Sequence, residues 1–139
     1  RLPLTFSLRL SALSTFKEEV QEYWNESDIP YDMDYPMIGG SGESYKIDFY
    51  VPISSRAWLV KTMSSQSRAY ANSLVSQAVR AWHDLQRADG RHRYLSMIDD
   101  SSDVWKPEWF DQLAEFSEVV VWSERDKLPK LLNLTHDTV

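Results

Sequence analysis

The sequence contains no cysteine, which excludes disulfide-bonded scaffolds, thiolate metal sites and cysteine nucleophiles. No apolar run approaches the roughly 20 residues that cross a bilayer, so we expect no integral membrane protein and no membrane partner. A Ser-x-Gly nucleophile elbow and a Walker lysine motif are also missing. These absences argue against thiol chemistry, elbow-type acyl transfer and phosphate-loop nucleotide hydrolysis.

The composition indicates a folded domain. The chain has 139 residues, of which 42% are hydrophobic and 13% aromatic, and this excludes a disordered chain. We expect residues 1–14 to be an N-terminal lead-in or linker and residues 15–139 to form a single α/β domain. Residues 2–13 are moderately apolar, but Arg9 interrupts them and no small-residue cleavage site follows. We therefore expect no signal peptide and a cytoplasmic protein.

The charge is unevenly distributed along the chain. The net charge is −6, but residues 1–50 carry −5, residues 51–93 carry +5 and residues 94–139 carry −6. The total argues against a simple nucleic-acid coat protein, because phosphate binding relies on Lys and Arg. The positive central segment keeps nucleic acid open as a partner for one surface.

Hydrophobic spacing predicts the order α-β-β-β-α-β-α-β-α. Thr15 with Glu18 forms a capping-box pattern at the start of the first helix. We expect helices at residues 15–27, 66–87, from Pro107 onward and 128–132, and strands at residues 31–38, 45–51, 57–63, 94–98 and 119–122. A helix between strands implies a crossover, so we expect a mixed α/β sheet with helices on its faces.

Several polar and aromatic motifs have ordinary structural interpretations. The glycine-rich turn at residues 39–42 leads into a strand, so a hairpin turn is favoured over a phosphate cradle. Adjacent helical residues point about 100° apart, so His83 and Asp84 are interpreted as surface or cap residues. The acids of residues 99–103 fit a solvated loop better than a cation site. Four tryptophans fall on apolar faces, whereas Trp24 and Trp105 are less determined and are candidates for a partner surface.

Four short motifs resemble a prokaryotic family labelled domain of unknown function 1829. They are Gly40-Ser41-Gly42, Ile47-Asp48-Phe49-Tyr50-Val51-Pro52, Ala81-Trp82-His83-Asp84 and Val121-Trp122-Ser123-Glu124-Arg125. The resemblance covers about residues 15–132. It implies a bacterial or phage protein in which an N-terminal partner domain precedes this module, which agrees with a chain that starts at Arg1. The family label supplies no activity.

The order of elements also resembles the PD-(D/E)XK, or restriction-endonuclease-like, nuclease fold. That resemblance implies Asp48 as a catalytic and metal-binding residue, Lys61 as the lysine that steers the nucleophile, and Mg²⁺ as the cofactor. If the turn between the two strands is centred between Ser54 and Ser55, Asp48 lies directly opposite Lys61. An ordinary ladder contact of Asp48 with Lys46 or Lys61 is the alternative.

The sequence departs from the nuclease motif at Leu59, where the motif has an acid two residues before the lysine. Leucine cannot bind a metal. Glu43, before the second strand, and Glu18, Glu19 or Glu22 of the first helix are candidate replacements, but the spacing selects none of them.

Basic residues of the central segment are candidates for a nucleic-acid groove. Arg80 and Arg87 lie seven residues apart on one side of the long helix. The other members are Arg56, Lys61, Arg68, Arg91 and Arg93. A solvated helix face is the alternative interpretation.

The leading hypothesis is a nuclease-like α/β module that acts in recognition or assembly and is catalytically degenerate. The resemblance suggests a phage-defence setting. One alternative is an active Mg²⁺-dependent nuclease on DNA or RNA. The other is a protein-binding module of the immunity or inhibitor type that uses the acidic flanks of the chain.

Overall fold

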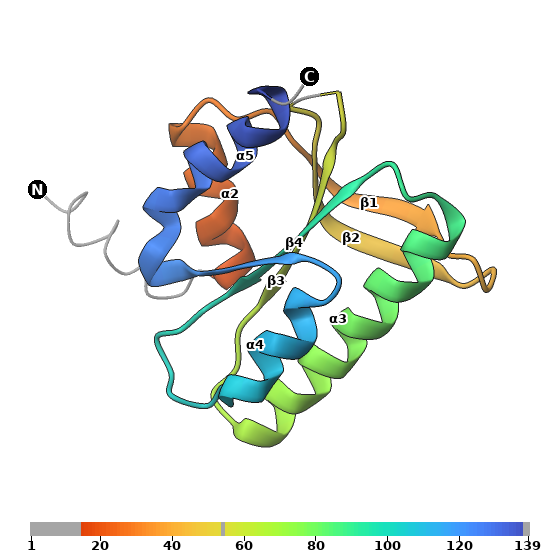
Figure 1. Ribbon diagram of the computed structural model, residues 1–139. Helices are drawn as coiled ribbons and strands as arrows, with labels where there is room; N and C mark the ends of the chain where they lie inside the picture. The colour runs from red at the N-terminus through yellow and green to blue at the C-terminus, as the bar shows by residue number, and fades with distance from the viewer. Residues whose placement is uncertain (1–14, 54, 138–139) are drawn as a thin grey trace, which may run out of the picture.

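The computed structural model describes residues 15–53 and 55–137, with side chains as far as residue 133. The expected lead-in at residues 1–14 lies outside the described residues. The elements follow the predicted order (Figure 1): α2 (Phe16–Glu26), β1 (Asp32–Ile38), β2 (Ser44–Val51), β3 (Trp58–Met63), α3 (Arg68–Ala88), β4 (Arg93–Ile98), α4 (Pro107–Ala114), β5 (Glu118–Val121), the short 3₁₀ helix η1 (Trp122–Lys127) and α5 (Leu128–Asp137).

The five strands form one mixed sheet, which confirms the α/β class. Their spatial order is β1-β2-β3-β4-β5. The first three strands are antiparallel neighbours, whereas β3, β4 and β5 run parallel. The parallel pairs need helical crossovers, and α3 and α4 supply them.

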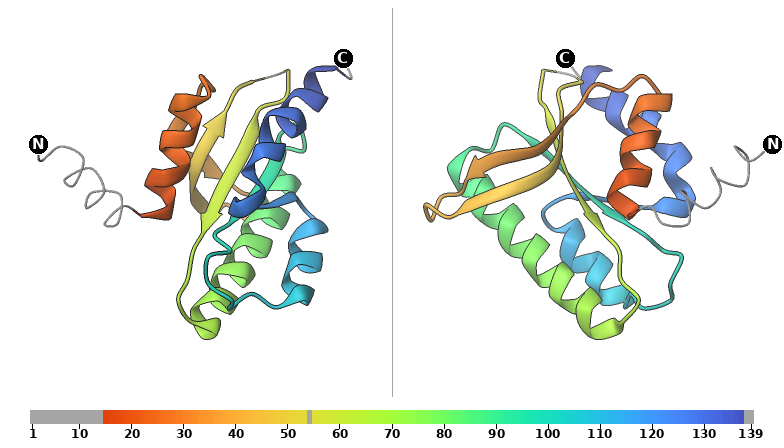
Figure 2. Two further views of the ribbon diagram at one scale, coloured as in Figure 1. Left: turned by 90° about the vertical axis from the view of Figure 1, so that its left-hand side faces the viewer. Right: turned by 180° about the vertical axis from the view of Figure 1, so that it is seen from behind.

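Helices cover both faces of the sheet, as the two views of Figure 2 show. One face packs against α2 and α5 through Val20, Trp24 and Leu132. The other face packs against α3 and α4, where Val75 and Leu113 belong to one cluster of buried apolar side chains. The sheet therefore separates two apolar layers.

The first helix begins as its sequence predicts. The Thr15 hydroxyl accepts a hydrogen bond from the Glu18 backbone N–H, and the Glu18 carboxylate accepts one from the Thr15 N–H at 2.8 Å. Two otherwise unpaired donors of the first turn are thereby satisfied. The capped turn is followed by Lys17, which pairs with Asp34 of β1 and lies near Asp48 of β2.

The turn between β1 and β2 is anchored on α3 by Asp84. This carboxylate accepts hydrogen bonds from the Ser41 backbone N–H at 2.9 Å, the Ser41 hydroxyl at 2.6 Å and the Tyr45 hydroxyl at 2.8 Å. The Gly40 N–H donates to the Asp84 backbone carbonyl at 2.8 Å. The turn is a hairpin turn, as predicted, but the prediction of a surface or cap role for Asp84 is wrong, because the side chain is buried.

Other expectations need correction at the level of single elements. Trp24 and Trp105 are buried in the core, so neither marks a partner surface. Trp122 opens η1 and does not end a strand. The last helix, α5, is longer than predicted, because it continues beyond residues 128–132, the apolar stretch from which it was predicted.

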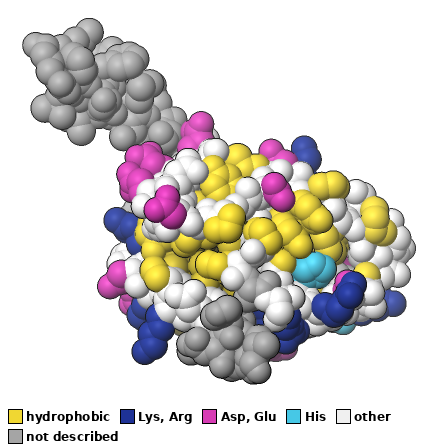
Figure 3. Space-filling model, turned by 90° about the horizontal axis from the view of Figure 1, so that it is seen from above, with side chains coloured by type: hydrophobic (Ala, Val, Ile, Leu, Met, Phe, Trp, Pro, Cys, Tyr) yellow, Lys and Arg dark blue, Asp and Glu magenta, His cyan; other side chains and the backbone are white. Residues whose placement is uncertain are grey.

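The surface is mixed, as expected for a domain whose apolar layers are enclosed. Viewed from above, hydrophobic side chains gather in the middle of the face and charged side chains lie around its rim (Figure 3). Within the described part of the chain, no helix combines the length and the apolar character that crossing a membrane requires.

Candidate functional site

Asp48 lies where the sheet forks. Strand β2 pairs with β1 from Ser44 to Tyr50, but its pairing with β3 begins only at Phe49↔Val60. One further step in the same register would place Asp48 opposite Lys61, so the hairpin has the register that the sequence predicts. Beyond this point β3 continues beside β4 alone, and the β1–β2 hairpin bends away toward α3.

The bend involves Asp34 on the neighbouring strand. Asp34 lies opposite Asp48 in the β1–β2 register and has a φ of 53°. This left-handed conformation is uncommon outside glycine, and aspartate tolerates it better than most residues. Met33 and Phe49 pack on the α2 side, whereas Tyr35 and Ile47 pack on the α3 side. Both strands therefore change face at these two aspartates.

The Asp48 carboxylate is occupied by contacts within the domain. Its Oδ2 accepts hydrogen bonds from the Thr62 backbone N–H at 2.8 Å and the Thr62 hydroxyl at 3.0 Å. Lys17 Nζ lies 3.8 Å from its Oδ1 and also pairs with Asp34. We call Lys17, Asp34, Asp48 and Thr62 the fork cluster. The carboxylate takes the acceptor position that a backbone carbonyl of β2 would occupy if the ladder continued.

Lys61 is not brought to this cluster. Its neighbours Leu59 and Met63 pack on the face covered by α3 and α4, while Val60 packs on the α2 face. Strand alternation therefore places Lys61 on the opposite side from Thr62, to which Asp48 is bonded. Among the described residues, no ion pair joins Lys61 to a carboxylate.

Of the four candidate glutamates, Glu43 lies away from the fork cluster, whereas Glu19 lines a cavity that Lys17 and Thr62 of the cluster also line. Glu43 is in the hairpin turn and pairs with Arg80 of α3. Glu19 is exposed on α2 and lines a cavity of about 570 Å³ at the carboxyl ends of β3 and β4, together with Thr62, Ser64 and Asp99. Partial burial, and then the nearby Asp99 carboxylate, raise the pKa of Glu19.

The donor set for a divalent cation is incomplete. Over residues 15–53 and 55–133, no group of three or more His, Asp or Glu side chains is placed to hold a metal ion. Magnesium prefers several oxygen ligands in octahedral geometry. The Asp99 carboxylate accepts a hydrogen bond from the Ser64 hydroxyl at 2.8 Å, and Asp48 is turned toward Thr62. These residues do not fit the Mg²⁺ that the nuclease resemblance implies.

The six candidate arginines do not form one groove. Arg68 and Arg87 are 19 positions apart on α3, which corresponds to about 28 Å along the helix axis. Arg80 pairs with Glu43, and Arg87 lies 3.9 Å from Asp84. Arg68 lines a shallow cavity beside Lys106 at the start of α4.

Arg91 is also neutralised locally. Its guanidinium lies 3.0 Å from the Asp89 carboxylate, and the resulting hydrogen bonds lower the pKa of Asp89 to about 2. The charge of Arg91 is therefore balanced by Asp89.

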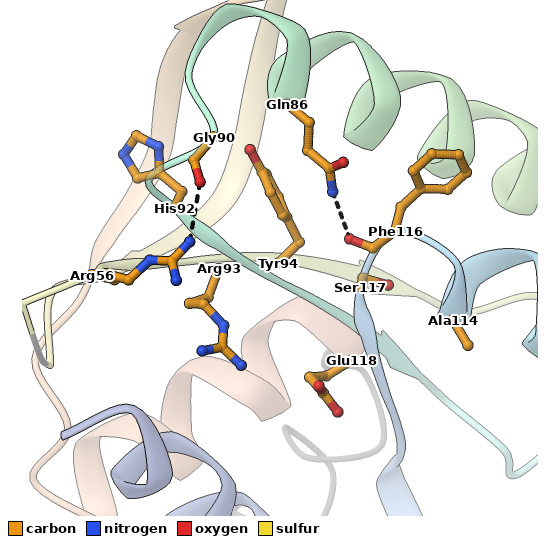
Figure 4. Close-up of a pocket in the computed structure, with 10 residues that line it drawn as sticks. All are labelled: Arg56, Gln86, Gly90, His92, Arg93, Tyr94, Ala114, Phe116, Ser117 and Glu118. Atoms are coloured by element: carbon orange, nitrogen blue, oxygen red, sulfur yellow. Dashed lines mark hydrogen bonds between the residues drawn. The ribbon is translucent and has the colours of Figure 1, made fainter. Parts of the chain in front are cut away.

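The remaining two arginines line a cavity of about 450 Å³ at the amino ends of β4 and β5 (Figure 4). Arg56 donates to the backbone carbonyls of Arg91 at 2.8 Å and Gly90 at 3.1 Å. The Arg93 guanidinium lies 5.1 Å from the centre of the Trp58 ring. Both side chains are thus held at the cavity wall by contacts with the fold.

Sequence reasoning missed the other residues of this cavity. Gln86 donates to the Phe116 carbonyl at 2.9 Å, and Tyr94, Ser117 and Glu118 complete the wall. Burial raises the pKa of Tyr94 to about 12, so its hydroxyl stays protonated. The available signal was that β4 and β5 are parallel, which brings the residues just before and at their starts to one edge of the sheet.

Comparison with known proteins gives the fold alone. No protein-family model matches the chain, and no curated protein matches it. A solved structure described as a protein of unknown function, AF1548, is similar in fold, with a TM-score of 0.56 and 9% sequence identity. The similarity covers 80% of this chain and 59% of that one, so the chain spans less than two thirds of the length of AF1548. The chain is therefore similar in architecture to a protein whose own function is not stated.

Proposed function

We propose that the domain is a nuclease-like recognition or assembly module that does not cleave phosphodiester bonds. The observation that carries the proposal is the state of Asp48, whose carboxylate is bonded to Thr62 and lies beside Lys17. Hydrolysis by a nuclease of this kind needs carboxylates that hold a metal ion and a cation near the attacking water. Here the Asp48 carboxylate instead accepts hydrogen bonds from Thr62 of β3, at the point where β2 and β3 separate.

The residues of β3 on the Asp48 side support the same proposal. The β3 residues on this side are Val60, which is buried in the core, and Thr62, which donates to Asp48. This side of β3 therefore carries neither a second carboxylate nor a lysine. Lys17 approaches from α2, but it is shared between Asp34 and Asp48. A lysine held by two carboxylates serves to neutralise them.

The partner in this proposal is a protein, either an N-terminal partner domain of the same polypeptide or a separate chain. Three of the six candidate arginines, Arg80, Arg87 and Arg91, face a carboxylate of the domain within 4 Å. Cations that are already paired contribute little to phosphate binding, because the pairing must first be broken.

The direct test is a cleavage assay. Purified domain is incubated with supercoiled plasmid DNA, single-stranded DNA and RNA in buffers that contain Mg²⁺ or Mn²⁺. We expect intact substrates at every metal concentration. Metal-dependent cleavage that disappears in Asp48→Ala would overturn the proposal and establish an active nuclease.

A stability measurement distinguishes a structural role of Asp48 from a catalytic one without an activity assay. Asp48→Ala leaves the Thr62 N–H without its acceptor, which we expect to cost about 1–3 kcal/mol of unfolding free energy in urea. The matched control Glu43→Ala removes an exposed carboxylate of the same charge and should change stability by less than about 1 kcal/mol. An Asp48→Ala variant as stable as the parent would contradict the structural role, because replacing strained catalytic carboxylates is often neutral or stabilising.

A further inference from the structure

The cavity of Figure 4 lies apart from the fork cluster and has the features of a ligand site. It is formed where β4 and β5 begin, between the end of α3 and the segment that follows α4. Its volume of about 450 Å³ falls in the range of sites for small molecules, roughly 300–1,000 Å³. None of its lining residues belongs to the fork cluster, so it is independent of the proposed function.

Two guanidinium groups and an imidazole ring line one wall of the cavity. Arg56, His92 and Arg93 lie on the same side of it in Figure 4. Arg93 stacks on Trp58, and no carboxylate in the described part of the chain lies within 4 Å of its guanidinium. His92 adds a ring nitrogen, Nδ1, that is buried without a hydrogen-bond partner among the described residues.

These basic groups are held in position before any ligand arrives. Two backbone carbonyls hold the Arg56 guanidinium, and an indole face holds that of Arg93. A guanidinium that is already oriented loses less conformational entropy when it binds an anion. Planar N–H donors of this kind match the oxygens of phosphate and carboxylate groups.

The opposite wall is suited to hydroxyl groups. It presents the exposed Glu118 carboxylate, and Gln86 closes its upper side. A carboxylate accepts hydrogen bonds from hydroxyl or amino groups but repels a second anion. A ligand that fills the cavity should therefore carry its negative charge at one end and hydroxyl groups at the other.

We propose that this cavity binds a small phosphorylated molecule whose body carries hydroxyl groups. The phosphate lies against Arg56 and Arg93, and the hydroxyl groups face the Glu118 carboxylate. A phosphomonoester carries close to two negative charges at pH 7, which two guanidinium groups balance better than they balance a single carboxylate. Sugar phosphates and mononucleotides share this chemistry, and the test distinguishes them.

The test is titration calorimetry of the intact chain with ribose 5-phosphate, adenosine 5′-monophosphate, ribose and inorganic phosphate. We expect at least one of the two phosphorylated ribose compounds to bind at least about 10-fold tighter than inorganic phosphate, and ribose alone to give no signal. If adenosine 5′-monophosphate binds more tightly than ribose 5-phosphate, the cavity is a mononucleotide site. If ribose 5-phosphate binds at least as tightly, the cavity is a sugar-phosphate site. No preference for either compound over inorganic phosphate would overturn the proposal.

Variants locate the site. Arg93→Gln should weaken the best ligand at least about 10-fold, because one charged hydrogen-bonding group is lost. The matched control Arg68→Gln removes an arginine at the far end of α3 and should leave the affinity unchanged. Equal effects of the two variants would refute the assignment.

A folding defect in Arg93→Gln is addressed by a second variant and a second measurement. Arg93→Lys keeps the charge and should give an intermediate affinity. Ligand-induced NMR shifts in the parent should centre on the amides of Arg93 and Glu118, and shifts centred elsewhere would contradict the site. Nuclease activity in the assay above would overturn the proposed function but would leave this inference standing.

Discussion

The buried indole N–H of Trp82 is hydrogen-bonded to a chain of two serine hydroxyl groups. Trp82 Nε1 donates to the Ser96 hydroxyl at 2.9 Å, which lies 2.8 Å from the Ser117 hydroxyl. Ser117 donates to the Leu113 carbonyl at 2.9 Å, so the hydrogen between the two serines comes from Ser96. By contrast, the indole nitrogens of Trp24 and Trp58 are buried without a partner in the described part of the chain.

We expect Ser96→Ala to destabilise the domain by about 1–3 kcal/mol, because it leaves the Trp82 N–H buried and unpaired. The measurement is the free energy of unfolding in urea. Ser73→Ala is the matched control, since Ser73 is an exposed serine whose hydroxyl accepts from Gln77. Equal stability of the two variants would show that Trp82 does not depend on Ser96.

The hairpin anchor at Asp84 predicts a pH dependence. Hydrogen bonds from Ser41, followed by that from Tyr45, lower the pKa of Asp84 in spite of its burial. The folded state therefore favours the charged form. Its stabilising contribution is present above the unfolded pKa, about 3.9, and is lost as the pH falls through the lower pKa of the folded state.

We expect Asp84→Asn to lower the Tm by about 4 °C at pH 7, and by progressively less as the pH falls from about 4 through the lowered pKa of the folded parent. Circular dichroism melts at pH 7, 4 and 3 provide the measurement. Asp111→Asn, an exposed carboxylate on α4, is the control. A difference between Asp84→Asn and the parent that stayed constant over this range would contradict the proposed linkage.

At the scale of elements, the contact between the hairpin and α3 leaves no room for a side chain at Gly39. A Cβ atom there would lie 2.2 Å from Asp84 Oδ2. We expect Gly39→Ala to cost about 1–3 kcal/mol in urea unfolding, because the hairpin or the helix must move. At Gly90 the nearest atom would be 3.9 Å away, so Gly90→Ala should be neutral or slightly stabilising. Similar losses in both variants would argue against close packing at Gly39.

The elements were predictable because each depends on local spacing. The capping box at Thr15 and the apolar face of α3 are patterns within a few turns, and the structure contains both. The β2–β3 register followed from the length of one turn. The role of Asp84 did not, because it depends on a turn that is 43 positions away in the chain.

The fork cluster escaped prediction for a related reason. Strand alternation alone would put Asp48 on the same face as Lys61, since directly opposite residues share a face. The change of face at Asp34 and Asp48 is a joint property of two strands and α2, and a single-strand pattern does not contain it. The cavity at the starts of β4 and β5 could not be predicted either, because it depends on the spatial order of the three parallel strands β3, β4 and β5.

For the whole molecule, folding disperses the positive charge that the central segment concentrates. Residues 51–93 carry a net +5 in sequence. In the structure Arg80 lies at the β1–β2 turn, Arg68 beside the start of α4, and Arg56 and Arg93 at the cavity where β4 and β5 begin. Arg80 and Arg91 each meet an acid of the domain, at Glu43 and Asp89. The net charge of −6 then repels a polyanion at longer range.

We therefore expect weak binding to a 20-base-pair DNA duplex at 150 mM salt, with a Kd no tighter than about 10⁻⁵ M, as for non-specific binding. Fluorescence anisotropy provides the measurement. The double variant Glu43→Gln/Asp89→Asn removes the acids that pair Arg80 and Arg91, so it should bind more tightly at 50 mM salt and show a steeper salt dependence. Tight, steeply salt-dependent binding by the parent would instead mean that the ion pairs open for phosphate, and the partner would then be a nucleic acid.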